Sequence, residues 1–176
     1  MSGQMRLLLD KNVVRRYFEG VSALARGLAL VAEEQQAILL VYLARKQGRR
    51  LFIPVEAYNL LQAHGRQIAP AETLMLLKRV EVLYPGHYSK RWARRLRQAG
   101  FTREDAKVLA LGAFGTDIEG GVLGVQAIVT YDRPLVRKWA LEIPMLQKRL
   151  AKMADGLEIP FRQVCLPDVV HPEEVV

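Results

Sequence analysis

Short apolar runs alternate with longer amphipathic stretches along the whole chain. Each run ends at a polar residue, a proline or a glycine, which is typical of buried strands. The runs predict strands at residues 5–9, 51–53, 80–84, 127–130 and 162–166.

Between these runs, apolar residues recur at helical spacing. The spacing predicts helices at residues 12–18, 21–47, 55–63, 70 onward, 89–98, 103–114, 134 onward and 145–154. Gly48 ends the second helix, and Thr102 is a predicted N-cap that forms a capping box with Asp105. The stretch 21–47 has more apolar surface than one helix face requires, so it is either deeply buried or contacts a partner.

Strands that alternate with helices predict an α/β fold. We expect three layers, α/β/α, around a mainly parallel twisted sheet of about five strands. One domain is expected over residues 1–176, with an irregular tail at 167–176. Right-handed crossovers then bring the carboxyl ends of the strands to one edge of the sheet, where ligands bind in such folds.

Composition narrows the class of protein. Hydrophobic residues make up 51% of the 176, which is enough for a proper core, and no long apolar stretch lacks charges, so no membrane span is predicted. Residues 1–6 show no signal sequence, and a cytoplasmic location is expected. The single cysteine, Cys165, is interpreted as a buried hydrophobe, and His64, His87 and His171 lack the spacing of zinc ligands.

The chain is basic, with a formal net charge of +8 and a pI of about 9.9. A basic surface favours polyanions such as RNA, DNA or acidic membrane surfaces. Five of the charges lie in one predicted helix, at Lys90, Arg91, Arg94, Arg95 and Arg97. This helix presents either a solvated face or a track for nucleic-acid phosphates.

Four carboxylates occupy strand ends or the first turns of helices: Asp10, Glu56, Asp105 and Asp132. These positions converge on one edge of a parallel sheet. Hard cations such as Mg²⁺ and Mn²⁺ need oxygen ligands, which clustered carboxylates supply. Each residue also has a structural interpretation, as a helix cap, a first-turn charge or a turn residue. Arg133 and Arg137, which lie beside Asp132, could hold a scissile strand.

In these motifs the chain resembles the PIN-domain ribonucleases, which include toxin components of toxin–antitoxin pairs. The matching segments are Leu9-Asp10-Lys11-Asn12, Pro54-Val55-Glu56-Ala57, Asp105-Ala106-Lys107-Val108, Val129-Thr130-Tyr131-Asp132 and Pro172-Glu173-Glu174. The resemblance implies metal-dependent RNA hydrolysis with Asp10, Asp105 and Asp132 as metal ligands. Glu56 would be a further ligand or would position water, while Asn12 and Thr130 would orient these groups. Dimers and an antitoxin partner are also implied.

The chain departs from the family pattern in two places. Asp105 and Asp132 are 27 residues apart (132 − 105), so residues 115–124 look like an insertion, and the segment 12–50 is long. Asp117 and Glu119 lie in the inserted loop, where they are either further ligands or turn residues, and we prefer the second interpretation.

Two other functions remain. The first is a PIN-like protein that binds RNA or assembles without catalysis, which predicts salt-sensitive RNA binding and no metal effect. The second is a phosphoacceptor domain of the receiver type. That function needs an aspartate at the end of the central strand, where this chain has Pro85-Gly86.

Overall fold

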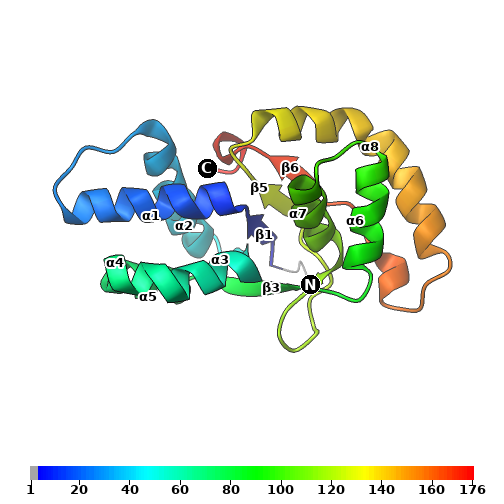
Figure 1. Ribbon diagram of the computed structural model, residues 1–176, viewed down its shortest axis with the longest axis horizontal. Coiled ribbons are helices and arrows are strands. Elements are labelled where there is room, and N and C mark those ends of the chain that lie inside the picture. The colour runs from blue at the N-terminus through cyan, green and yellow to red at the C-terminus, as the bar shows by residue number, and fades with distance from the viewer. Residues whose placement is uncertain (1–3) are drawn as a thin grey trace.

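The computed structural model describes residues 4–176 and contains a six-stranded sheet (Figure 1). The strands are β1 (Arg6–Leu9), β2 (Arg50–Pro54), β3 (Glu81–Pro85), β4 (Gly115–Thr116), β5 (Ala127–Val129) and β6 (Asp168–Val170). Their order is β4-β3-β2-β1-β5-β6, and all neighbours are parallel except β3 and β4. The predicted α/β class and mainly parallel sheet are confirmed, with one strand more than expected.

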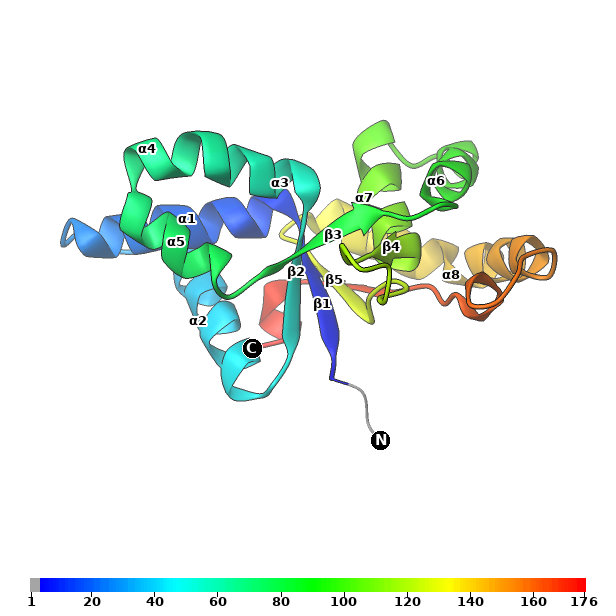
Figure 2. The same ribbon diagram turned by 90° about the horizontal axis from the view of Figure 1, so that it is seen from below.

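Helices cover both faces of the sheet (Figures 1 and 2). They are α1 (Lys11–Ala25), α2 (Ala32–Lys46), α3 (Val55–Leu60), α4 (Arg66–Ile68), α5 (Pro70–Leu77), α6 (Ser89–Gln98), α7 (Arg103–Phe114) and α8 (Arg133–Ala154). A π-helical turn at Leu61–Gly65 joins α3 to α4, and 3₁₀ turns occupy Phe161–Gln163 and Pro172–Glu174. Within residues 4–176, no helix is long and apolar enough to cross a membrane.

Alternate residues of the central strands supply two separate cores. Leu7 and Leu9 of β1 face α1 and α2, whereas Leu8 faces α6, α7 and α8. All three leucines are fully buried, as a strand covered on both faces requires. Trp92 of α6 and Trp139 of α8 belong to the core that contains Leu8. This arrangement explains why the strands are continuous apolar runs rather than alternating ones.

The predicted helix at 21–47 is wrong, because the chain turns back between α1 and α2. The turn is at Gly27, whose φ of 67° is unfavourable for a residue with a side chain. Gly20, which looked like a helix boundary, lies inside α1. A Cβ atom at Gly20 would approach the Ile38 side chain of α2 to 2.9 Å, so the glycine allows the two helices to pack closely.

The C-terminal prediction is also wrong. The final strand is β6, inside the segment expected to be irregular, and not residues 162–166. β6 pairs with β5 in parallel, with Val129 opposite Val170, and the indole of Trp139 donates to the Pro167 carbonyl oxygen at 3.1 Å just before it. Cys165 precedes this strand and is exposed, so its interpretation as a buried hydrophobe is incorrect.

Other elements match the pattern closely. α6 has the predicted bounds, and Trp92 and Leu96 are buried on its inner face as their spacing implies. The two helices predicted after residue 134 are one helix, α8, which contains Pro144. The start of the apparent insertion at residues 115–124 forms β4, a two-residue strand that pairs antiparallel with β3.

Candidate functional site at the carboxyl edge of the sheet

Asp10 stands where β1 ends and α1 begins. Its backbone N–H donates to the Val129 carbonyl oxygen at 3.0 Å, which extends the pairing of β1 with β5 beyond the strand. Its Oδ1 accepts the Lys11 backbone N–H at 2.7 Å, so Asp10 caps α1. Its Oδ2 accepts the Thr130 hydroxyl at 2.9 Å. Both carboxylate oxygens are therefore held in place.

Thr130 joins the polar groups of this site. Its hydroxyl oxygen accepts the Asn12 side-chain amide at 3.0 Å and the Asp132 backbone N–H at 3.1 Å. Because both of these groups are donors, the single hydroxyl proton is directed to Asp10. The amide oxygen of Asn12 accepts the Tyr131 N–H at 3.2 Å. Thr130 is fully buried, whereas Asp10, Asn12 and Asp132 are half-buried, so the network is shielded from water on one side only.

Asp132 caps α8 in the way that Asp10 caps α1. Its Oδ1 accepts the Leu135 N–H at 2.9 Å, and its Oδ2 has no hydrogen-bond partner among residues 4–176. Burial raises the pKa of Asp10, and the nearby negative charge of Asp132 adds to the increase. The hydrogen bonds from Thr130 and Lys11 act in the opposite direction. The two carboxylates are thus close enough to interact.

Asp105 lies in the first turn of α7. Thr102 caps this helix by accepting the Asp105 N–H at 3.1 Å, but Asp105 does not return a side-chain bond, so only half of the predicted capping box forms. An ion pair between Lys11 and Glu104 (3.8 Å) places the start of α7 beside the start of α1. Within the described part of the chain, the Asp105 carboxylate has no hydrogen-bond or ion-pair partner.

Glu56 is exposed in the first turn of α3. Because α3 follows β2, the neighbour of β1 in the sheet, Glu56 belongs to the same edge as Asp10. It too has no hydrogen-bond or ion-pair partner among residues 4–176. Glu56 and Asp105 therefore lie at the carboxyl edge of the sheet, but neither is hydrogen-bonded to the network of Asp10 and Thr130.

The donor set is made of oxygen atoms, which suits Mg²⁺ or Mn²⁺ rather than zinc. Two of the predicted acids, Asp10 and Asp132, are brought together through Thr130. Between residues 4 and 176, no group of three or more His, Cys, Asp or Glu residues lies close enough to hold a metal ion. The arrangement fits a cation bound by Asp10 and Asp132. The side chains of Glu56 and Asp105 would have to turn toward that cation to become ligands.

Asp117 lies away from this edge. Its Oδ1 accepts the N–H groups of Glu119 (3.1 Å) and Gly121 (2.8 Å), which is a turn interaction. It follows β4, which runs antiparallel to β3 and so leads back toward the opposite edge. The charge of Asp117 accordingly raises the pKa of Arg50 at the start of β2, as a minor contribution beside that of Glu81. The interpretation of Asp117 as a turn residue agrees with this geometry.

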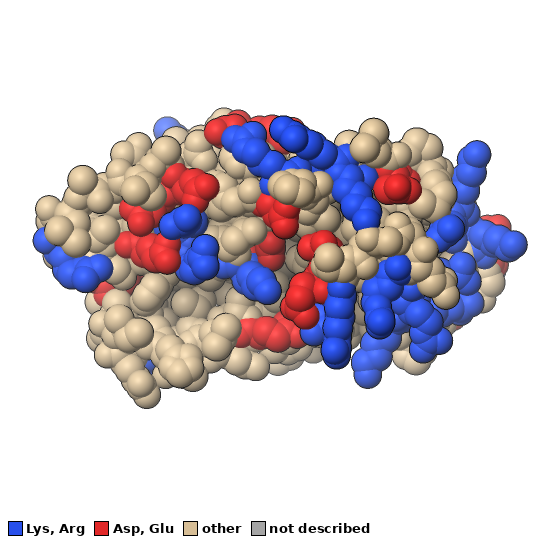
Figure 3. Space-filling model, turned by 45° about the horizontal axis from the view of Figure 1, so that its top comes forward, with Lys and Arg blue, Asp and Glu red and all other residues tan. Residues whose placement is uncertain are grey.

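Basic side chains flank the acidic site on one side. Figure 3 shows Asp and Glu gathered in the middle of this face, with Lys and Arg concentrated over the half that contains α6 and α8. In α6, four of the five bases are exposed and Arg95 is half-buried, and none forms an ion pair within residues 4–176. Arg133 instead pairs with Glu173 at 3.1 Å, whereas Arg137 is exposed and has no such pair.

Sequence reasoning missed two features. The Tyr131 hydroxyl donates to the Glu33 carbonyl oxygen at 2.6 Å, which connects the site to α2, and burial raises the pKa of Tyr131 to about 12. The second feature is a group of basic residues at the opposite edge of the sheet. The sequence indicates this group, because basic residues precede two strands: they lie in Arg45–Arg50 and in Lys78-Arg79.

No protein-family model matches the chain, and no curated protein matches its sequence. The resemblance to the PIN-domain family therefore stays a prediction from the motifs.

Proposed function

We propose that the carboxyl edge of the sheet binds Mg²⁺ or Mn²⁺ and that the protein hydrolyses RNA phosphodiester bonds. One observation carries the proposal. Asp10 and Asp132 are 122 residues apart in sequence (132 − 10), yet both are joined to the buried hydroxyl of Thr130. The negative charge of Asp132 adds to the rise in the Asp10 pKa, and a cation bound between the two residues would offset this repulsion.

Each residue of the edge has a defined task in this proposal. Asp10 and Asp132 would bind the cation. The Thr130 hydroxyl keeps the Asp10 carboxylate in position, the Leu135 N–H does the same for Asp132, and Asn12 orients the Thr130 hydroxyl. Asp105 and Glu56 complete the set of oxygen donors by turning their side chains, which breaks no hydrogen bond or ion pair within residues 4–176. The bound cation supplies an activated water for attack on phosphorus.

The basic helix α6 holds the RNA backbone. Its exposed Lys90, Arg91, Arg94 and Arg97 point away from the core beside the acidic edge, and Arg137 of α8 adds a further charge. An acidic site needs such a border, because acids alone repel a polyanion. Arg133 is engaged by Glu173 and contributes less than its position in the sequence suggests.

The central test is cleavage of a mixed-sequence RNA with Mn²⁺. Asp10→Asn and Asp132→Asn should each reduce the rate by at least about 100-fold, because each removes a proposed cation ligand. Asp168→Asn is the matched control, since Asp168 is an exposed aspartate at the start of β6, on the other edge. Equal cleavage by the wild type and both variants would contradict the proposal, as would no cleavage at any Mn²⁺ concentration.

A second function, RNA binding without catalysis, is favoured by the absence of a three-residue metal group within residues 4–176. It predicts RNA binding that weakens with salt and does not respond to Mn²⁺. Arg91→Gln/Arg94→Gln should weaken binding and reduce its salt dependence under either function. A rise in melting temperature with Mn²⁺ in the wild type, but not in Asp132→Asn, would separate the two in favour of the metal site.

The proposal also includes a protein partner, either a second copy or an antitoxin segment. Leu24, Leu28 and Val31 at the α1–α2 turn are each more than half exposed. Apolar side chains grouped in this way favour protein contacts. Sedimentation of the wild type and of Leu24→Gln/Leu28→Gln tests for a dimer. A monomer at all concentrations would exclude the second copy.

A further inference from the structure

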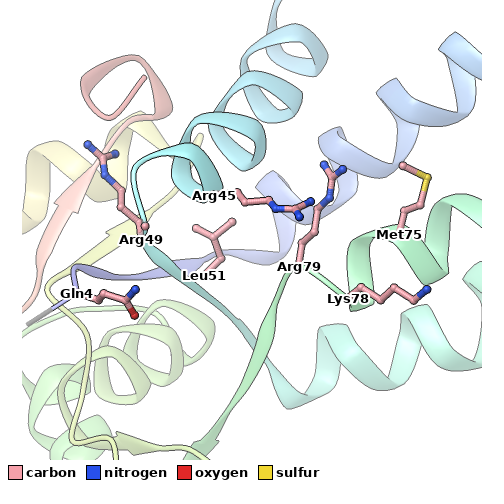
Figure 4. Close-up of a pocket in the computed structure, with 8 residues that line it drawn as sticks. Gln4, Arg45, Arg49, Leu51, Met75, Lys78 and Arg79 are labelled. Atoms are coloured by element: carbon pink, nitrogen blue, oxygen red, sulfur yellow. The ribbon is translucent and has the colours of Figure 1, made fainter.

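A hollow of about 470 Å³ lies at the amino edge of the sheet, opposite the acidic site (Figure 4). Its apolar lining includes the buried Leu51 of β2 and the exposed Met75 of α5, and its polar lining includes Arg45, Arg49, Lys78 and Arg79. A second hollow of about 310 Å³ continues from it and adds Tyr42 and Lys46. Arg45 and Arg79 line both, so the two hollows adjoin, and together they are called the amino-edge pocket.

The charge of this pocket is unbalanced. Its lining contains five cations and no acid. Among residues 4–176, none of the five forms an ion pair, and the nearest acid in sequence, Glu81, is bound by Arg50 at 2.8 Å. The C-termini of α2 and α5 meet here, and each contributes roughly half a negative charge. About one charge of the five is therefore offset, which leaves a strongly positive hollow.

Separate elements bring the cations together. Arg45 lies in the last turn of α2, and Arg79 follows α5 just before β3. Figure 4 shows their guanidinium groups directed toward one another, whereas Arg49 points away, where it donates to the Val175 carbonyl oxygen at 2.9 Å. Arg79 also lies beside the hydroxyl of the buried Tyr17. Guanidinium groups that converge without an anion repel each other, and a bound phosphate removes this repulsion.

We propose that this pocket binds a nucleoside phosphate. Arg45 and Arg79 contact the phosphate groups, because guanidinium groups match phosphate oxygens in charge and geometry. Lys78 lines the same hollow but its side chain runs away from these two arginines (Figure 4), so it adds positive charge without converging on the same point. Tyr42 is 57% exposed at the rim and stacks on the base. The volume is within the range of small-ligand pockets. The ligand is a free nucleoside di- or triphosphate or the phosphorylated end of an RNA strand, and the inference does not depend on catalysis at the other edge.

Titration calorimetry at low salt tests the proposal with three probes: inorganic pyrophosphate, ADP, and an RNA decamer carrying either a 5′-phosphate or a 5′-hydroxyl. All phosphorylated probes should bind the wild type. Arg45→Gln/Lys78→Gln should weaken the binding of pyrophosphate and ADP by at least about tenfold, because one guanidinium contact and one nearby positive charge are lost. Both side chains are exposed, so the fold should tolerate the change. Tyr42→Ala should weaken the binding of ADP and leave that of pyrophosphate unchanged.

Lys148→Gln/Lys152→Gln is the matched control, since it removes two exposed charges from α8. It should leave binding unchanged. Tighter binding of the 5′-phosphate decamer than of the 5′-hydroxyl decamer, lost in the pocket variant, identifies an RNA end, because α6 would hold the backbone of both decamers equally. Equal binding of the two decamers, with ADP binding weakened in the pocket variant, identifies a free nucleotide. The proposal is overturned if no probe binds, or if the control weakens binding as much as the pocket variant. Loss of RNA cleavage in the Asp10 or Asp132 variants would leave these results unaffected, so the two proposals fail independently.

Discussion

The two edges of the sheet carry opposite charge. Helices α1, α3 and α8 begin at the carboxyl edge, where Asp10, Glu56 and Asp132 lie, and α2 and α5 end at the amino edge, where the Arg45 and Arg79 pocket lies. Helix dipoles favour acids at helix starts and bases at helix ends. Chain direction therefore favours the sign of charge found at each edge, and that sign is not by itself evidence of function.

The two edges differ in how their charges are compensated. At the carboxyl edge, a part-buried network of hydrogen bonds through Thr130 fixes the carboxylate of Asp10 and the backbone of Asp132. At the amino edge, the cations surround a hollow and no acid pairs with them within residues 4–176. At the carboxyl edge, hydrogen bonds fix the positions of the charged groups. At the amino edge, the charged groups line an open hollow. This comparison predicts different responses to mutation, pH and salt.

The largest stability effect should come from breaking the network. Thr130→Val removes three hydrogen bonds and leaves buried donors unpaired, which should lower the free energy of unfolding by about 2 kcal/mol in urea titrations. Thr73→Val is the matched control, because Thr73 is equally buried and its hydroxyl has no partner. That change should be neutral or stabilising. Equal losses in the two variants would mean that the Thr130 network adds no stability.

A smaller effect should appear in the pH dependence of stability. Burial raises the pKa of Asp10 above its usual value of 3.8, so the folded state favours the protonated form. The stabilisation is present below that value and is lost as the pH rises through the folded pKa. Relative to Asp10→Asn, the wild type should thus lose stability between the acid range and neutrality, as measured by urea unfolding at several pH values. Parallel curves would indicate an unshifted pKa.

The smallest effect should come from the amino edge. Arg45→Gln/Lys78→Gln reduces repulsion among cations and should raise the melting temperature by about 1 °C at low salt. At high salt the gain should disappear, because the charges are then screened. A lower melting temperature at low salt would show that these side chains stabilise the fold and that the pocket charges are already compensated.

Local patterns were sufficient for much of the fold. The buried strands, helix α6 and the Thr102 cap were predictable because apolar periodicity and capping chemistry depend on neighbouring residues. The positions of Asp10 and Asp132 at strand ends followed from the same patterns. The α1–α2 turn was not predictable, because Gly20 and Gly27 look alike in sequence and only packing against Ile38 distinguishes them.

Longer-range features required the folded chain. β6 forms where it does because β5 offers an open edge with the correct register, which no local signal reveals. The Thr130 hydroxyl connects residues from both ends of the sequence, and the amino-edge pocket collects side chains from α2, β2 and α5. The amino-acid order alone thus specified which residues end strands and carry charge. Which of them share a site depends on strand order and helix packing, because distances between remote segments exist only in the folded protein.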